Sequence, residues 1–285
     1  NKDVTIRLFT DDGTVVPCEE KYTTGMQLQK ELDVESDALD DNYTPYQIEF
    51  PLDAGCRKKI SIVCTIEDVY EKDAFATAAA EMARFDALEK KAGYHDELAE
   101  TLTIAADHFL AYRQSTGLMT VLAGLPWFTD WGRDTMIALT GLTLSTRRYQ
   151  DARDILTTFA RYVHHGMVPN MFPDEGTAPL YNTADASMWY FYAVGKYLDY
   201  TGTPEDYAFV QETIYPKLKE IIAAYEHGTD FSIYMEEDGL IHAGSGLDQV
   251  TWMDVRVGDW VATPRHGKPV EINALWYHAL CLMEE

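Results

Sequence analysis

The stretch MWYFYAVGKYL, residues 188–198, is apolar on nearly every side when it is wound into a helix. Such a helix is stable in a globular protein only when neighbouring elements enclose it. The segments MIALTGLTL at 136–144 and INALWYHALCLM at 272–283 have the same character. We therefore expect these three segments to form enclosed helices.

The helices expected before each enclosed segment are amphipathic. Segments 97–113, 150–164 and 205–227 each repeat apolar residues at the helical period and keep one polar side. Amphipathic and enclosed helices therefore alternate along the chain. This alternation is typical of α-hairpins that form an inner ring covered by an outer ring. The expected fold class is mainly α. The predicted apolar faces are Leu98, Leu102, Ala105 and Phe109; Ile155, Leu156, Phe159, Tyr162 and Val163; and Val210, Ile214, Leu218, Ile221, Ile222 and Tyr225.

The loops that enter the enclosed helices are long, at 116–133, 166–184 and 228–269, whereas the loops that leave them are short. Long loops on a rigid scaffold tend to carry function. All three lead to the N-terminus of an inner helix, so we expect them to meet at one end of the inner ring. The functional site is expected at that end.

Residues 1–70 have a different pattern. TIRLF, YQIEF and KISIVCTI cluster β-branched and aromatic residues between Gly and Asp turn signals, which predicts strands. We expect them to be the end of a β-rich domain, as part of a β-sandwich. Residues 71–93 are rich in helix formers and predict a linker helix. The helical domain is then expected at 94–285.

The charge of the chain restricts its partners. The 285 residues carry a formal net charge of −24, and a field of this sign repels nucleic acid and anionic membranes. A neutral ligand fits better. No apolar run is long enough to predict a membrane span. The cysteines and histidines show no metal-ligand spacing, and phosphate-binding and serine-nucleophile motifs are absent. We expect a cytoplasmic protein without a metal site.

The first long loop ends in LPWFTDWGRDTM, residues 125–136. An indole stacks on the C–H face of a pyranose, a guanidinium donates through a fixed fork, and a carboxylate accepts from vicinal hydroxyls. Trp131, Arg133 and Asp134 are therefore suited to hold a sugar. An equally good interpretation is a helix N-terminus capped by Asp130 or Asp134, with the arginine beside it.

Two acidic residues open the other enclosed helices. Asp185 precedes the aromatic helix, where a cap is the favoured interpretation, although its carboxylate could also point into the same cleft with support from the helix dipole. Glu271 opens the last enclosed helix. It either satisfies the helix start or contacts a ligand.

The third long loop contains TWMDVRVGDW, residues 251–260. Trp252 and Met253 flank Asp254, and apolar surroundings desolvate a carboxylate, favour its protonated form and suit it to donate a proton near neutral pH. Asp259 is a weaker candidate for the same role. Asp254 is thus the predicted acid.

Five motifs in order, GLPWFTDWGRDTMIAL, YNTADASMWYF, DGLIHAG, TWMD and GKPVEINALWY, resemble the C-terminal amylo-α-1,6-glucosidase domain of glycogen debranching enzymes. The resemblance covers roughly residues 94–285. It implies an (α/α)6 toroid, inverting hydrolysis of α-1,6-linked glucosyl stubs in glycogen or another branched α-glucan, and no metal or organic cofactor. It also implies that Asp254 is the general acid and that Trp131, Arg133 and Asp134 hold glucose.

The sequence departs from that family at its end. The family's complete toroid has twelve helices, whereas this chain ends inside or just after the sixth. We expect the general base and the closing half of the ring to be absent, so the 285-residue chain alone is expected to be catalytically silent. Its uncovered inner helices, at 136–144 and 272–283, are expected to favour self-association.

Two other functions fit the same residues. A glucoamylase-like, trehalase-like or phosphorylase-like toroid would use the same scaffold, and the basic run PRHGK, with Arg265, His266 and Lys268, is the place where phosphate could bind. A non-catalytic glycan-binding module would stack sugar on Trp131 and Trp252 without cleaving it.

Overall fold

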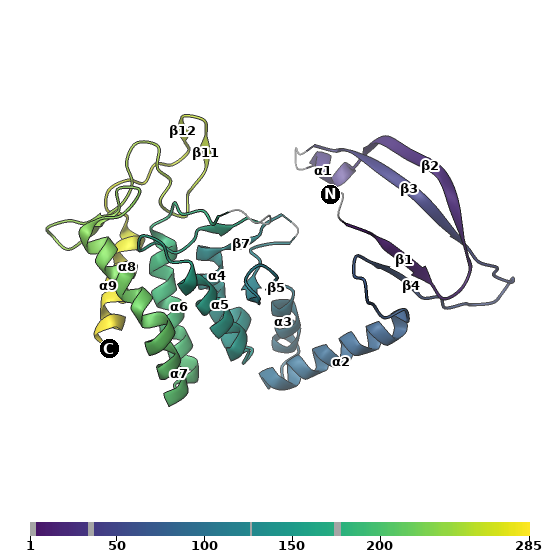
Figure 1. Cartoon of the computed structure of the whole chain (residues 1–285), viewed down its shortest axis with the longest axis horizontal. Coiled ribbons are helices and arrows are strands. Elements are labelled where there is room, and N and C mark those ends of the chain that lie inside the picture. The colour runs from purple at the N-terminus through teal and green to yellow at the C-terminus, as the bar shows by residue number, and fades with distance from the viewer. Residues whose placement is uncertain (1–3, 34–36, 126, 174–177) are drawn as a thin grey trace. The chain divides into compact units, whose positions relative to one another are not determined.

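The computed structural model describes residues 4–33, 37–125, 127–173 and 178–285, and the chain divides into two compact units. The N-terminal unit is Asn1–Phe85 and the helical unit is Asp86–Glu285. Each unit has its own secondary structure (Figure 1). The helix α2 (Ala74–Ala92) crosses the boundary and lies where a linker helix was expected.

The N-terminal unit contains strands where the sequence predicted them. Its strands make two antiparallel pairs, in which Phe9 faces Val63 in the first and Val15 faces Ile48 in the second. Most described side chains of the unit are exposed, and Ala38 is one of its few buried apolar residues. Its elements are β1 (Arg7–Thr10) paired with β4 (Ile62–Thr65), β2 (Thr14–Gln27) paired with β3 (Leu39–Glu49), and the short helix α1 (Gln29–Asp33).

The helical unit consists of α-hairpins joined by loops that contain very short strands (Figure 1). Its elements are α3 (Glu97–Asp107), β5 (Leu110–Arg113), β6 (Leu118–Val121), β7 (Asp130–Trp131), α4 (Gly132–Leu139) with the π-turn η1 (Thr140–Leu144), α5 (Tyr149–Arg161), β8 (Met171–Phe172), α6 (Asp185–Thr201), α7 (Pro204–Phe209), the π-turn η2 (Val210–Ile214), α8 (Tyr215–His227), β9 (Tyr234–Met235), β10 (Ile241–His242), β11 (Arg256–Val257), β12 (Trp260–Val261) and α9 (Val270–Glu284).

The helix α6 lies at the centre of the unit. It packs against α4 on one side and α9 on the other, so these three helices form an inner row. The helix α5 packs on α6 and η1, and α8 stacks Tyr225 on Trp276 of α9 with ring centroids 6.2 Å apart. The alternation of inner and outer helices predicted from the sequence is therefore present in these three hairpins.

The inner helices differ in how far they are enclosed. Tyr190 and Phe191 of α6 are fully buried, as predicted. The helices α4 and α9 each keep an exposed apolar side, where Ile137 and Tyr277 are open to solvent. The apolar sides expected to be uncovered at 136–144 and 272–283 are thus exposed in the structure.

The predicted outer faces are confirmed except on the first helix. Ile155 and Phe159 of α5, and Ile214 and Ile221 of the third outer helix, are fully buried. For 97–113 the prediction was wrong both about where the helix ends and about which face is buried. The helix α3 ends at Asp107, and the chain then turns into the β5–β6 hairpin. Leu98 and Leu102 are exposed, whereas the small side chains Thr103 and Ala106 are buried on α3, which packs on η1.

The third outer helix is interrupted at a proline. Pro216 lies in the first turn of α8, directly after the π-turn η2. Proline has no backbone N–H and cannot join the regular helical ladder, so the preceding turn widens. The apolar face nevertheless continues through the interruption, since Val210, Ile214 and Leu218 are all buried.

Asp206 ties three helices together at the end opposite the long loops. It receives hydrogen bonds from Arg153 Nη2 of α5 at 2.5 Å, from the Tyr197 hydroxyl of α6, and from Thr203 Oγ1 at 2.6 Å. Burial opposes ionisation of this carboxyl, but these hydrogen bonds outweigh it and hold the pKa of Asp206 well below its ordinary value. The carboxylate is therefore a charged cross-link between helices.

We predict that Asp206→Asn lowers the free energy of unfolding by about 2–4 kcal/mol at pH 7, because it removes the charge from three buried hydrogen bonds. The folded pKa lies below the unfolded value of about 3.9. The stabilisation by the ionised Asp206 is therefore fully present above about pH 5 and is lost as the pH falls toward the folded pKa. Denaturant titration followed by tryptophan fluorescence reports on the helical unit, which contains every tryptophan of the chain.

The matched control is Asp199→Asn, which removes the exposed ion pair of Asp199 with Lys196 on the neighbouring turn of α6. An exposed pair of this kind contributes less than about 1 kcal/mol. Equal losses in the two variants, or a loss for Asp206→Asn that does not shrink below about pH 4, would contradict the charged cross-link.

Candidate active site

The first two long loops are joined at the start of α4. The strands β7 and β8 pair antiparallel, and the backbone N–H of Gly132 donates to the carbonyl of Asn170 at 2.9 Å. An ideal Cβ on Gly132 would lie 2.1 Å from the carbonyl oxygen of Pro169. Only glycine therefore permits this approach, and it brings Arg133 against the second loop.

The second and third loops are joined just before α6. The backbone N–H of Ala184 donates to the carbonyl of Val250 at 2.8 Å, and Asn182 Nδ2 donates to the carbonyl of Gln249 at 3.3 Å. The buried hydroxyl of Tyr225, on α8, donates to the carbonyl of Ala184 at 2.8 Å. The three loops thus meet at one end of the inner row, as the sequence analysis expected.

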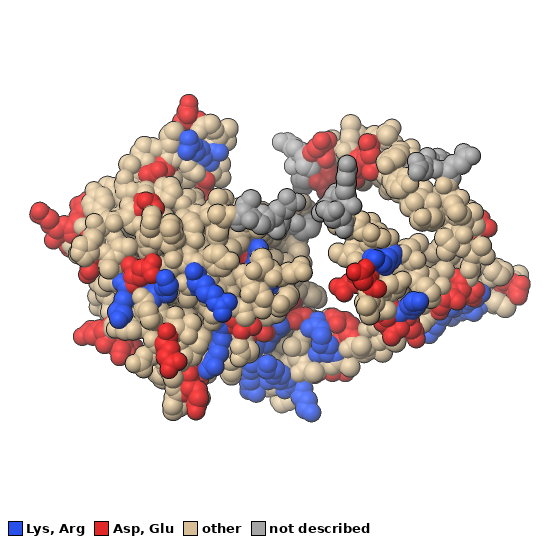
Figure 2. All heavy atoms as spheres, viewed as in Figure 1, with Lys and Arg blue, Asp and Glu red and all other residues tan. Residues whose placement is uncertain are grey.

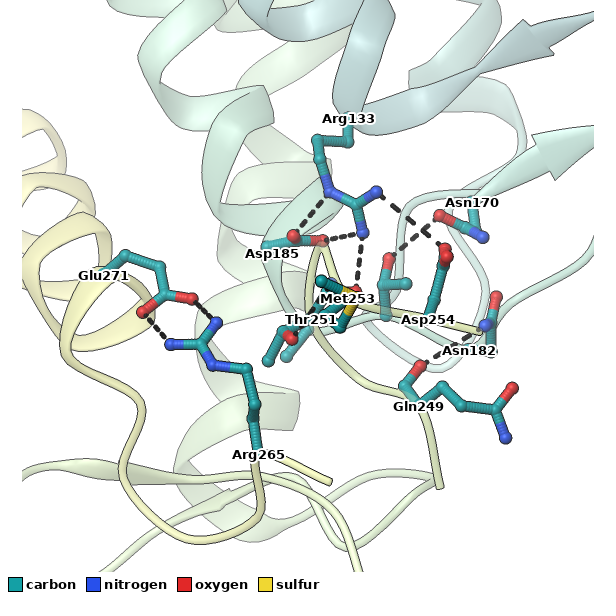
Figure 3. Close-up of polar contacts among 12 residues, drawn as sticks. Arg133, Asn170, Asn182, Asp185, Gln249, Thr251, Met253, Asp254, Arg265 and Glu271 are labelled. Carbon is teal, nitrogen blue, oxygen red and sulfur yellow. Dashed lines mark hydrogen bonds and ion pairs between the residues drawn. The ribbon is translucent and has the colours of Figure 1, made fainter. Parts of the chain in front are cut away.

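The side chain of Arg133 connects all three loops (Figure 3). Its Nε and Nη2 donate to the two carboxylate oxygens of Asp185 at 2.6 and 3.2 Å. Nη2 also donates to the carbonyl of Thr251 at 2.9 Å, and Nη1 lies 3.9 Å from Oδ2 of Asp254. We call these four residues the Arg133 junction. The guanidinium therefore hydrogen-bonds to Asp185 and to the backbone of Thr251, in the same loop as Asp254, and its third nitrogen, Nη1, makes a longer ion pair with Asp254 itself.

Asp185 is the buried partner in this junction. Burial raises the pKa of its carboxyl, and the charge and hydrogen bonds of Arg133 oppose that rise. Its side chain is 3% exposed and both oxygens are bonded to Arg133. Asp185 was predicted as a sugar contact or a cap. The cap prediction was wrong, because Ala184 occupies the cap position of α6, and the Asp185 carboxylate binds the Arg133 guanidinium.

A pocket of about 270 Å³ adjoins the junction. Asp134 is exposed and Asp254 is partly exposed beside it, with 25% of the latter's side chain open to solvent. A second hollow of about 360 Å³ shares Ala123, Arg133 and Asp134 with the first and continues along the uncovered side of α4. The first pocket combines two acidic groups with two aromatic rings, and its lining residues are Ala123, Phe128, Trp131, Arg133, Asp134 and Asp254.

The surroundings of Asp254 differ from the prediction. Trp252 is 56% exposed and Met253 is only partly buried, so the two flanking side chains do not enclose the carboxylate. Side chains of adjacent residues in an extended segment point in different directions, and neighbours in sequence are for that reason poor neighbours in space. The groups that face Asp254 come instead from the first loop and from α4.

The predicted cap of the first inner helix is also corrected. Trp131 occupies the N-cap of α4, and no side chain caps the helix there. Asp130 is fully buried and accepts hydrogen bonds from Arg113 Nε at 2.7 Å and Thr120 Oγ1 at 2.8 Å. Asp134 is exposed in the first turn of α4. Asp130 therefore supports the β5–β6 hairpin, and Asp134 is free to face a ligand in the pocket.

Glu271 lies outside the pocket lining. Both of its carboxylate oxygens accept from Arg265, which holds the pKa of Glu271 below its ordinary value (Figure 3). The guanidinium of Arg265 also lies 5.9 Å from the Trp252 ring centroid. Arg265 thus contacts both Glu271 and Trp252. The sequence left two roles open for Glu271, the helix start or a ligand contact, and the structure adds this pairing with Arg265.

The basic run PRHGK offers little to phosphate. Arg265 is paired with Glu271, Lys268 Nζ lies 2.7 Å from Glu236 and 2.6 Å from Asp238, and His266 Nε2 lies 3.0 Å from the carbonyl of Asp248. Each of the three side chains already has an acidic or carbonyl partner. Phosphate would have to displace these groups, which disfavours the phosphorolytic alternative.

Sequence reasoning missed several parts of the site. Phe128 lines the pocket, and Thr251 binds Arg133 through its backbone carbonyl, which no side-chain motif can reveal. Over the described ranges, no group of three or more His, Cys, Asp or Glu side chains could hold a metal ion. No helix among those residues is long and apolar enough to cross a membrane.

Comparison with known proteins agrees with the resemblance carried by the five motifs. Residues 104–285 match a family model described as amylo-alpha-1,6-glucosidase. The chain is also 28% identical over 256 residues to the glycogen debranching enzyme of Saccharomyces cerevisiae. That similarity covers 68% of this chain and 16% of the yeast protein, so the chain spans about a sixth of that relative's length. Because the family model matches more than half of the chain, including the Arg133 junction and its pocket, this chain belongs to the amylo-alpha-1,6-glucosidase family.

Proposed function

We propose that the helical unit takes part in the inverting hydrolysis of α-1,6-linked glucosyl stubs on a branched α-glucan such as glycogen, with Asp254 as the general acid. The observation that carries this proposal is the pocket in which Asp254, Asp134 and Trp131 meet. An inverting glycosidase protonates the bridging oxygen with one carboxylic acid, while a distant carboxylate activates water. Asp254 is the partly exposed carboxyl that the Arg133 junction holds in position at the pocket wall.

The remaining pocket residues suit a terminal glucose. Trp131 offers an indole to the C–H face of the ring, and the Asp134 carboxylate accepts hydrogen bonds from hydroxyls. Neither needs a charged ligand, in agreement with a protein whose net charge is −24. We assign glucose recognition to Trp131 and Asp134. We assign no general base among the described residues.

Arg133 has a different part in this proposal. The family resemblance suggests that it holds glucose, but its Nε and Nη2 are committed to Asp185 and Thr251. Displacing them would leave Asp185 buried and unpaired, which is costly. We propose that Arg133 positions Asp254 and that Nη1 is its one donor open to a sugar hydroxyl. Arg133 is thus a positioning residue.

The assignment of Asp254 predicts a substrate-dependent loss. In the whole protein to which this chain belongs, Asp254→Asn should lower kcat on a phosphorylase limit dextrin by about two orders of magnitude or more, the size expected when a general acid is removed, with little change in binding. An α-glucosyl fluoride has a leaving group that needs little protonation and should be affected far less. Equal losses on both substrates, or near-normal turnover of the dextrin, would overturn the assignment.

A second prediction separates positioning from recognition. Asp134→Ala should weaken binding of an acarbose-like inhibitor by about 1.5–3 kcal/mol and leave the unfolding free energy nearly unchanged, because its side chain is exposed. Arg133→Ala should lower the unfolding free energy by about 3–5 kcal/mol, because it leaves the Asp185 carboxylate buried without its cation.

The matched control is the double variant Arg133→Ala with Asp185→Ala, which removes both charges. It should be more stable than Arg133→Ala alone, since no unpaired charge remains. Inhibitor titration and denaturant unfolding of the same preparations measure both effects. A stable Arg133→Ala protein that loses inhibitor affinity would show that Arg133 recognises sugar directly, and the positioning role would be wrong.

A further inference from the structure

The segment that follows Asp254 forms a small hairpin that stands out from the helical unit (Figure 1). The strands β11 and β12 pair antiparallel, with Arg256 opposite Val261 and Val257 opposite Trp260. Its turn contains Gly258 in the left-handed region at φ 58°. The backbone N–H of Ala262 donates to the carbonyl of Val255 at 3.0 Å and closes the base of the hairpin.

The two faces of this hairpin have different surroundings. Alternate residues of a strand point to opposite faces, and directly paired residues share one face. Val261 therefore lies on the face that turns toward the protein, and it is 8% exposed. The opposite face carries Val255, Val257 and Trp260, which are 52%, 65% and 60% exposed. We call these three residues the outer face of the hairpin.

An exposed apolar face of this kind needs an explanation. A two-stranded hairpin is marginally stable in water by itself, and an exposed tryptophan with two exposed valines adds nothing to its folding. Figure 2 shows charged groups at the tip of this projection and on the side that faces the viewer, with uncharged surface beside them. Contiguous apolar surface that is rimmed by polar groups marks a binding site more often than an accident of folding.

The size and place of the outer face favour a sugar chain over a protein partner. Stable protein interfaces use about 20–30 residues on each side, whereas this face has one large ring and two small side chains. The C–H face of a glucose unit matches the area of one indole. The hairpin also begins at the residue after Asp254. Trp260 pairs with Val257, which lies two residues beyond Val255, a distance of about 7 Å along the strand.

We propose that the outer face, with Trp260 as its platform, binds the neutral α-glucan chain on the leaving-group side of the bond that Asp254 protonates. This inference rests on the proposed function for the identity of the substrate. The pocket beside Asp254 would hold the glucosyl stub, and the hairpin would hold the chain from which the stub branches. Trp260 is in this account a specificity-determining residue for long substrates, and it takes no part in proton transfer.

The experiment compares Trp260→Ala with two matched variants in the protein. Trp260→Phe keeps an aromatic platform and should rescue binding. Tyr207→Ala removes another half-exposed aromatic side chain, on α7 at the opposite end of the helices, and should behave like the wild type. Binding of maltoheptaose is measured by calorimetry, and turnover is measured with limit dextrin and with α-glucosyl fluoride.

Trp260→Ala should weaken maltoheptaose binding about tenfold and raise KM for limit dextrin by a similar factor, the size expected for loss of one buried indole. The kcat for α-glucosyl fluoride, which fills only the pocket, should not change. Unaltered maltoheptaose affinity in Trp260→Ala would overturn the proposal. So would a change from dimer to monomer in that variant, because the outer face would then cover a second copy of the chain.

Failure of the proposed function has a different result. All assays use the whole protein to which this chain belongs. If its wild type binds maltoheptaose and releases no glucose from any substrate, while Trp260→Ala still loses binding, then the hairpin site stands and the hydrolytic function falls. If Asp254→Asn abolishes hydrolysis and Trp260→Ala changes neither KM nor affinity, then the hydrolytic function stands and the hairpin site falls.

Discussion

The candidate site depends on one charge interaction, the bidentate pair between Arg133 and the buried carboxylate of Asp185. Asp185 is enclosed at the start of α6, and without a cation it would destabilise the folded state. Arg133 supplies that cation from the start of α4 and uses its remaining donors on the third loop. The pair between two inner helices thus places a cation beside Asp254, with Nη1 of Arg133 3.9 Å from its carboxylate.

The inner row explains why this interaction can be rigid. The helices α4, α6 and α9 lie side by side under one outer layer, and their N-termini present the long loops at one end. Gly132 allows the closest contact between two of those loops, because any side chain there would collide with Pro169. At the other end, Asp206 holds α5, α6 and α7 together. The loops can therefore be irregular while their attachment points stay fixed.

The alternation of inner and outer helices and the convergence of the loops could be predicted from the sequence, because they rest on the periodicity of many residues. The first outer helix is the exception, since its end and its buried face were predicted wrongly. The local surroundings of single carboxylates could not. Asp185 and Asp130 were both expected as possible caps, yet each binds an arginine 52 or 17 positions away in sequence. Asp254 is flanked by Trp252 and Met253 in sequence and faces Arg133 in space. Such pairings depend on tertiary packing, which periodicity does not encode.

The central claim is that Arg133 positions Asp254 while Trp131 and Asp134 recognise the sugar. A crystal structure of the protein with an acarbose-like inhibitor tests it most directly. The account predicts the inhibitor in the pocket beside Phe128, with its nitrogen within hydrogen-bond distance of Asp254, its hydroxyls donating to Asp134, and the Arg133–Asp185 pair intact. An inhibitor bound to Arg133 Nε and Nη2, with Asp185 released, would contradict it.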